Sequence, residues 1–176
     1  MRMTRLVLVS TLVLLLAGTP GDANKPTAPP ILGCWRIVTS ADARYPVGGQ
    51  LCLHEGAVVA WSERGTVDDA WPVGWASQGA GWRATVPPQH TAGQDVHFDL
   101  ARASSAELTF RSGSGWIDVR LGGSTALRSD EPVARLRACL ACLAASPQAS
   151  QLDGPAYSLR SCKLASSALG LRCPSR

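Results

Sequence analysis

Two cysteines, Cys139 and Cys142, stand three positions apart in the segment "CLAC". This spacing is typical of thiol redox pairs and of half a zinc site. A redox pair is most reactive at a helix N-terminus, where the dipole favours the thiolate, but these two cysteines lie well inside a predicted helix. A zinc site would need two more ligands, for which Cys162 and Cys173 are available. We favour a structural role and keep a redox pair and a metal site as alternatives.

The chain holds six cysteines in all: Cys34, Cys52, Cys139, Cys142, Cys162 and Cys173. An even number in a chain with an export leader predicts three disulfides. Spacing alone does not choose among the possible pairings. The simplest pairing joins Cys34 to Cys52 and joins the two predicted C-terminal helices to each other. We expect no bound metal and no cofactor.

The aromatic residues are dominated by tryptophan, with six Trp against two Phe and two Tyr. Trp71 and Trp75 fall in "AWPVGWASQGAGW", whose Pro and Gly residues predict a loop. Trp116 falls among the polar alternates of a predicted strand. Because exposed aromatic clusters mark binding sites, we predict ligand binding at Trp71, Trp75 and Trp116. The alternative for Trp71 and Trp75 is the core, which a chain with so few other aromatics must fill with Trp.

The three histidines, His54, His90 and His97, are too scattered for a metal motif. His97 lies between Asp95 and Asp99 and could bind a cation or act as a base, but a solvated strand face explains this pattern better. Four acidic residues in predicted loops could offer paired carboxylates for glycosidic chemistry, and we interpret them as solvated charges: Glu55, Glu63, Asp68 and Asp69. No nucleophile-elbow, zinc-protease, phosphate-loop or EF-hand motif occurs. The sequence therefore predicts a protein that is not an enzyme.

Short runs rich in β-branched and aromatic residues must position these side chains. They are "ILGCWRIVT", "QLCLH", "AVVAWS", "GWRATV", "QDVHFDLA", "AELTFRS" and "WIDVRL", separated by Gly, Pro, Ser and Asp. The later runs alternate, with Val96, Phe98 and Leu100 on one face and polar residues on the other. This pattern predicts a mainly β domain, a small antiparallel barrel or sandwich of seven or eight short strands.

A different pattern follows residue 128. "SDEPVARLRACLACLAAS" places Val133, Leu136, Leu140 and Leu143 at helical spacing, with Pro132 in the first turn. A second, shorter helix is expected over about residues 155–169, ending at Gly170. We therefore expect a C-terminal helical segment, stapled by disulfides, over residues 129–176.

The N-terminal residues resemble an export leader. Arg2 and Arg5 precede an apolar run that breaks near Pro20, which predicts a signal peptide over residues 1–23 and a proline-rich linker over 24–30. The barrel domain is then residues 31–128. We expect a periplasmic or secreted protein that does not span the membrane. The tail from Arg128 carries seven Lys or Arg against three acids, which we interpret as solubility charge, with contact to an anionic envelope or an acidic partner as the alternative. We expect no nucleic-acid partner.

The opening "LGCWRI", with Gly33-x-Trp35 on the first strand, resembles the lipocalin-like or calycin small barrels. That resemblance implies that Trp35 closes the bottom of a barrel. The chain is also similar to the bacterial periplasmic metalloprotease inhibitors in its Gly-x-Trp, in Cys52 and in "PVGW" at residues 72–75. It lacks that family's second barrel cysteine, so no inhibitory residue is carried over.

These observations predict a monomeric, non-enzymatic binding module for a small apolar, glycan or peptide ligand. Its partner would be such a ligand or a secreted or envelope protein. One alternative is an inhibitor of a protease or a lysozyme. Another is a thiol oxidoreductase that uses Cys139 and Cys142.

Overall fold

The computed structural model describes residues 31–91, 93–113, 118–148 and 156–174. Within them lie β1 Gly33–Ser40, β2 Gln50–His54, β3 Ala57–Trp61, β4 Val67–Pro72, β5 Gly74–Gln78, β6 Gly81–Thr85, β7 His97–Arg102, β8 Glu107–Ser112, β9 Asp118–Thr125, the 3-10 turn η1 Pro88–His90, and the helices α1 Glu131–Ala144 and α2 Leu159–Ala168. The predicted leader and linker, and Trp116, lie outside the described residues.

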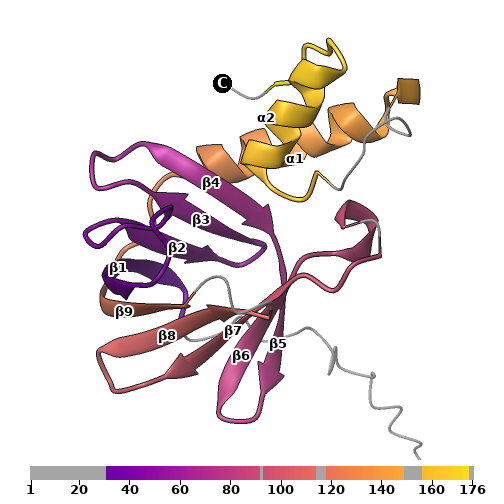
Figure 1. Ribbon diagram of the computed structural model, residues 1–176. Helices are drawn as coiled ribbons and strands as arrows, with labels where there is room; N and C mark the ends of the chain where they lie inside the picture. Colours follow the sequence, from indigo (N-terminus) through magenta and orange to yellow (C-terminus); the bar gives the residue numbers. More distant parts are fainter. Residues whose placement is uncertain (1–30, 92, 114–117, 149–155, 175–176) are drawn as a thin grey trace, which may run out of the picture.

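The strands form one antiparallel sheet in the order β4-β3-β2-β1-β9-β8-β7-β6-β5. Because β1 pairs with β9, the first and last strands are neighbours, and the sheet curls into a nearly closed barrel (Figure 1). The two edges are β4 and β5, which are joined only through Val73. The predicted mainly β architecture with a helical C-terminal segment is confirmed.

Alternating residues fill the barrel interior. The predicted inward faces are confirmed, since Phe98, Leu100, Leu108 and Phe110 are at most 2% exposed. Trp35 is buried as well, and its indole N–H donates to the carbonyl of Ile31 over 2.9 Å. The interior is therefore packed with side chains of the chain itself.

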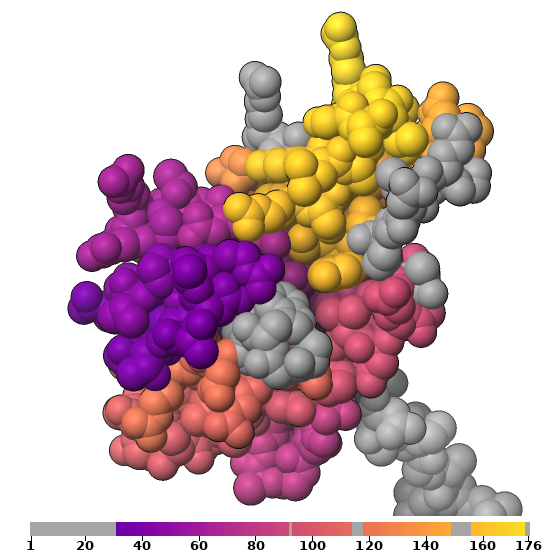
Figure 2. Space-filling model, in the orientation of Figure 1, coloured from indigo at the N-terminus to yellow at the C-terminus, as the bar shows by residue number. Residues whose placement is uncertain are grey.

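A second core lies on the outside of the barrel. Val59 on β3 and Ala70 on β4 are buried against the helices, whereas their neighbours Val58 and Trp71 are buried in the interior. The apolar stripe predicted on α1 faces this second core. Figures 1 and 2 show α1 and α2 as a layer over one side of the barrel. Strands β3 and β4 are thus covered on both faces, as in the interior of a larger protein.

One disulfide lies within the barrel, and two lie within the helical layer. Cys34–Cys52 joins paired residues of β1 and β2, Cys139–Cys162 joins α1 to α2, and Cys142–Cys173 joins α1 to the C-terminal segment. The predicted three disulfides and the simplest pairing are confirmed. The two cysteines of "CLAC" are bonded to different partners and not to each other.

The structure corrects the predicted loop around Trp71 and Trp75. Trp71 lies in β4 and Trp75 in β5, so the sheet has nine strands where seven or eight were expected. Asp, Pro and Gly are depleted in strands. Because β4 and β5 contain these residues, the sequence pattern predicted a loop instead of strands. These residues are tolerated because Pro72 ends an edge strand and because a register shift opposite Ala60 and Trp61 accommodates the acidic pair of β4.

The disulfide between the helices should be a main source of stability for this layer. Replacing both cysteines, Cys139→Ala with Cys162→Ala, should lower the free energy of unfolding by about 3 kcal/mol, because a long loop gains freedom in the unfolded chain. Urea unfolding followed by circular dichroism measures this. Ala138→Ser, an exposed change on the same helix, is the control and should leave the midpoint nearly unchanged. Equal stability of the double variant and the control would contradict the assignment.

Candidate functional site

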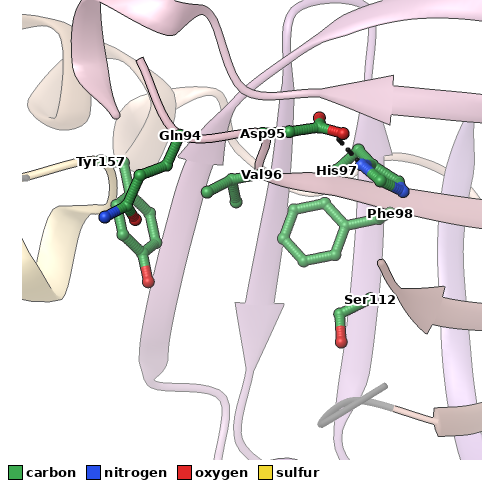
Figure 3. A pocket seen from close by; sticks show the side chains of 7 residues that line it. All are labelled: Gln94, Asp95, Val96, His97, Phe98, Ser112 and Tyr157. Carbon is green, nitrogen blue, oxygen red and sulfur yellow. Dashed lines mark hydrogen bonds and ion pairs between the residues drawn. The ribbon is translucent and has the colours of Figure 1, made fainter. Parts of the chain in front are cut away.

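Two hollows lie where the segment before α2 meets the barrel, and Tyr157 lines both. The first, of about 200 Å³, is lined by Gln94, Asp95, Val96, His97, Phe98, Ser112 and Tyr157 (Figure 3). The second, of about 190 Å³, is lined by Arg44, Tyr45, Asp69, Trp71, Tyr157, Ser158, Arg160, Ser161 and Leu164. We call these two hollows together the rim site.

A row of aromatic rings forms the floor of the rim site. Tyr45 lies 5.8 Å from Trp71, Trp71 meets Phe98 edge-on at 5.5 Å, and Phe98 stacks on Phe110 at 5.0 Å. Figure 3 shows Phe98 and Val96 projecting into the first hollow, with Tyr157 beside Gln94 at its side. Tightly packed rings have little freedom to move. The floor is therefore rigid and apolar.

Asp69 on β4 connects this floor to α2. Its Oδ1 accepts the backbone N–H of Arg160 over 2.9 Å and that of Ala70 over 2.8 Å. Ser158 and Ser161 form a reciprocal capping box at the same helix end. Asp69 thus serves as a second cap of α2, supplied by the barrel.

Burial dominates the electrostatics at the second hollow. Desolvation raises the pKa of Asp69, and the hydrogen bonds from Arg160 and Ala70 offset only part of this. Burial also raises the pKa of the Tyr45 phenol, and the nearby charge of Asp69 adds to that effect. Both groups are therefore poorly solvated at the base of the hollow, and Tyr45 stays protonated at neutral pH.

The mouth of the second hollow carries positive charge. The Arg44 guanidinium holds Asp42 through bonds of 3.0 and 2.6 Å, and this hydrogen bonding lowers the pKa of the Asp42 carboxyl. Arg44 also lies 5.9 Å from the centre of the Tyr45 ring. Arg160 is exposed on the first turn of α2. Arg44 is thus held in place, and the mouth offers guanidinium donors.

The structure separates the predicted ligand-binding residues. Trp71 is 1% exposed and lines only the second hollow, from below. Trp75 lines neither hollow, and its indole N–H donates to the carbonyl of His54 over 2.8 Å. Trp116 lies outside the described residues. A ligand-binding role for these three tryptophans stays a prediction.

Sequence reasoning missed most of the rim site. Tyr157, Tyr45 and Arg44 carry no motif, and Asp69 was interpreted as a solvated loop charge, which is wrong because it is buried. The one available signal was the position of Tyr157 next to Ser158, a natural N-cap residue. The rest depends on contacts between segments far apart in the chain.

His97 belongs to a polar network on the outer sheet face. Its Nδ1 lies 2.9 Å from Asp95, and its Nε2 lies 3.8 Å from Asp99, which Arg83 holds through two bonds. The hydrogen bonds from Arg83 lower the pKa of Asp99. Over the described part of the chain, no group of three or more His, Cys, Asp or Glu side chains is arranged to hold a metal ion. The network is a set of polar side chains that contact one another along a strand face.

Comparison of the chain with protein-family models, with curated proteins and with solved structures finds no match. The likeness to calycin barrels therefore rests on Gly33-x-Trp35 and on the barrel itself. Among the described residues, no helix is long and apolar enough to cross a bilayer.

The two functions of Asp69, charge and cap, can be separated. Asp69→Ala should lower the free energy of unfolding by roughly 1–3 kcal/mol, because the Arg160 N–H loses its acceptor. Asp69→Asn keeps an acceptor oxygen and removes the buried charge, so it should match or exceed the parent in stability at neutral pH. Urea unfolding of the three proteins measures both effects.

The pH dependence of this pair has a definite sign. A raised pKa of Asp69 in the folded state contributes stability below the unfolded pKa of about 3.9, and this is lost as pH rises through the folded pKa. The advantage of Asn over Asp should therefore grow from about pH 4 to about pH 7. An advantage that shrinks over this range would contradict a raised pKa.

Proposed function

We propose that this protein is an extracytoplasmic, non-enzymatic binding module whose rim site takes a group the size of one sugar ring or one amino-acid side chain. The observation that carries the proposal is the pair of adjoining hollows that meet at Tyr157 above a row of packed aromatic rings. A cavity of about 150 Å³ holds a benzene ring, so each hollow has room for one such group.

The lining chemistry supports a ligand with both polar and apolar faces. Val96, Phe98 and Trp71 provide an apolar base, and Gln94, Tyr157 and other polar side chains surround it. An apolar base with a few convergent polar groups is the usual composition of a small-ligand site. A glycan residue or a peptide side chain with its amide presents this combination. Because side chains fill the barrel interior, the ligand would bind at the rim and not in a deep cup.

The rim is held rigid before any ligand arrives. The Asp69 cap and the Cys139–Cys162 bridge fix α2, which follows Tyr157 directly. A site that is already ordered loses less conformational entropy on binding. Rigid positioning therefore supports a binding role at modest buried area.

The disulfides support the cellular location. Three bridges in a domain of this size are typical of oxidising compartments, which favours the periplasm or the exterior.

The other two functions have less support. Cys139 and Cys142 form bridges to separate partners, and Cys139 is fully buried, which does not favour an oxidoreductase. An inhibitor of a protease or a lysozyme stays a prediction, since no contact or motif points to such an enzyme.

Tyr157 is the residue on which to test the site. Calorimetric titration with a panel of mono- and disaccharides and blocked tripeptides should find ligands in the panel. Tyr157→Ala should weaken binding about tenfold, which corresponds to about 1.4 kcal/mol. Thr109→Ala, on the outer sheet face and outside both hollows, is the matched control and should bind like the parent. Equal loss in both variants, or no binding by any panel member, would reject the rim site.

A further inference from the structure

The two edge strands of the sheet, β4 and β5, differ in what packs against them. Strand β4 contacts both α1 and α2, whereas β5 is hydrogen-bonded to β6 alone among the described strands. Four of the five residues of β5 are exposed. The helical layer therefore packs on one edge strand, and the other edge strand is exposed.

The hairpin between β5 and β6 determines which backbone groups are free. Its loop is Gly79 and Ala80, so the flanking pair Gln78 and Gly81 exchanges both hydrogen bonds. Hydrogen-bonded pairs then alternate along the ladder, and Ala76 is bonded to Arg83. The N–H and C=O groups of Trp75 and Ser77 consequently point away from β6, toward the open edge.

This edge carries none of the usual protection. From Gly74 to Gly81 there is no charged residue and no proline, and natural edge strands are normally blocked by one or the other. The side chains of β5 other than Trp75 and Gln78 are small. The indole N–H of Trp75 donates a hydrogen bond to the carbonyl of His54, which fixes the strand. An incoming strand would thus meet an ordered backbone without steric or charge opposition.

We propose that β5 binds an extended, uncharged peptide segment of a partner protein by strand addition. The peptide would pair antiparallel or parallel with the outward groups of Trp75 and Ser77, and its own alternating side chains would lie beside Gly74 and Ala76. This surface is distinct from the rim site, and Trp75 lines neither of its hollows. Backbone pairing of this kind is a common mode of peptide recognition.

The size of the edge favours a peptide over a second copy of the chain. Five residues span about 17 Å, and the two outward residues offer four backbone hydrogen-bonding groups. A stable dimer buries about 1,200 Å² or more, which a single short strand of small residues does not provide. The absence of charge in β5 favours an uncharged partner, and Arg83, which pairs with Ala76 on the neighbouring strand, is already bound to Asp99.

Amide hydrogen exchange tests the open edge directly. In the free protein, the amides of Trp75 and Ser77 should exchange quickly while that of Ala76 is protected. Saturating peptide should slow the first two amides and leave the third unchanged. Equal protection of all three amides in the free protein would overturn the proposal.

Proline at position 77 tests the binding mode. An array of capped, uncharged hexapeptides built from Ser, Thr, Val and Ala is the probe. Ser77→Pro removes an outward N–H that the β5–β6 ladder does not use, and edge strands tolerate proline at such positions, so the ladder and the melting temperature should survive while peptide binding falls at least tenfold. Ser77→Thr keeps the N–H and should bind within twofold of the parent.

Three results would overturn the proposal: no array peptide binds at millimolar concentration, Ser77→Pro binds as well as Ser77→Thr, or the parent forms a dimer that Ser77→Pro abolishes. The last would assign the edge to a second copy. Tyr157→Ala should leave array binding unchanged, which separates this surface from the rim site.

Discussion

The connection between β4 and β5 is the constraint on which the architecture depends. A hairpin needs at least two residues to reverse the chain, and here Val73 alone links the two strands. The chain therefore runs on from one half of the barrel into the other, and β4 and β5 cannot become neighbours in the sheet. Hydrogen bonds from the Val73 N–H to Gly56 and from the Trp75 indole to His54 hold this junction against the β2–β3 hairpin. The barrel therefore has two edge strands, β4 and β5, which meet at Val73.

Each edge strand contributes to a different surface of the protein. On the β4 side, the helical segment covers the outer face, the Asp69 cap joins α2 to the barrel, and the Cys139–Cys162 bridge joins α2 to α1. That placement brings Tyr157 over the aromatic floor and creates the rim site. On the β5 side nothing among the described residues covers the strand, so its backbone stays available. One short connection thus accounts for both surfaces that we propose as binding sites, the rim site and the exposed edge of β5.

The sequence predicted those strands and helices whose local residue pattern is strong. Strands β1 to β3 and β6 to β9 were predicted from short runs rich in β-branched and aromatic residues, and in the later ones apolar residues such as Phe98 and Leu100 also alternate with polar ones. Helix α1 was recognised from Val133, Leu136, Leu140 and Leu143 at helical spacing. Strands β4 and β5 were missed because Asp69, Pro72 and Gly74 normally favour turns. Those residues are tolerated there because the helix end supplies partners for Asp69 and the edge position requires no N–H from Pro72.

The sequence by itself determined the mainly β class, the helical C-terminal segment, the six cysteines and the inward faces of the late strands, since these depend on local periodicity and residue type. Only the tertiary structure decided which tryptophan is core and which fixes an edge, that Asp69 is a buried cap, and that Arg44, Tyr45 and Tyr157 come together. These properties arise from contacts between residues far apart in the chain, such as Asp69 and Arg160, which are separated by 91 positions, and local sequence does not encode which distant segments meet. The two proposed binding surfaces belong to this second group, because both form where the two halves of the barrel part.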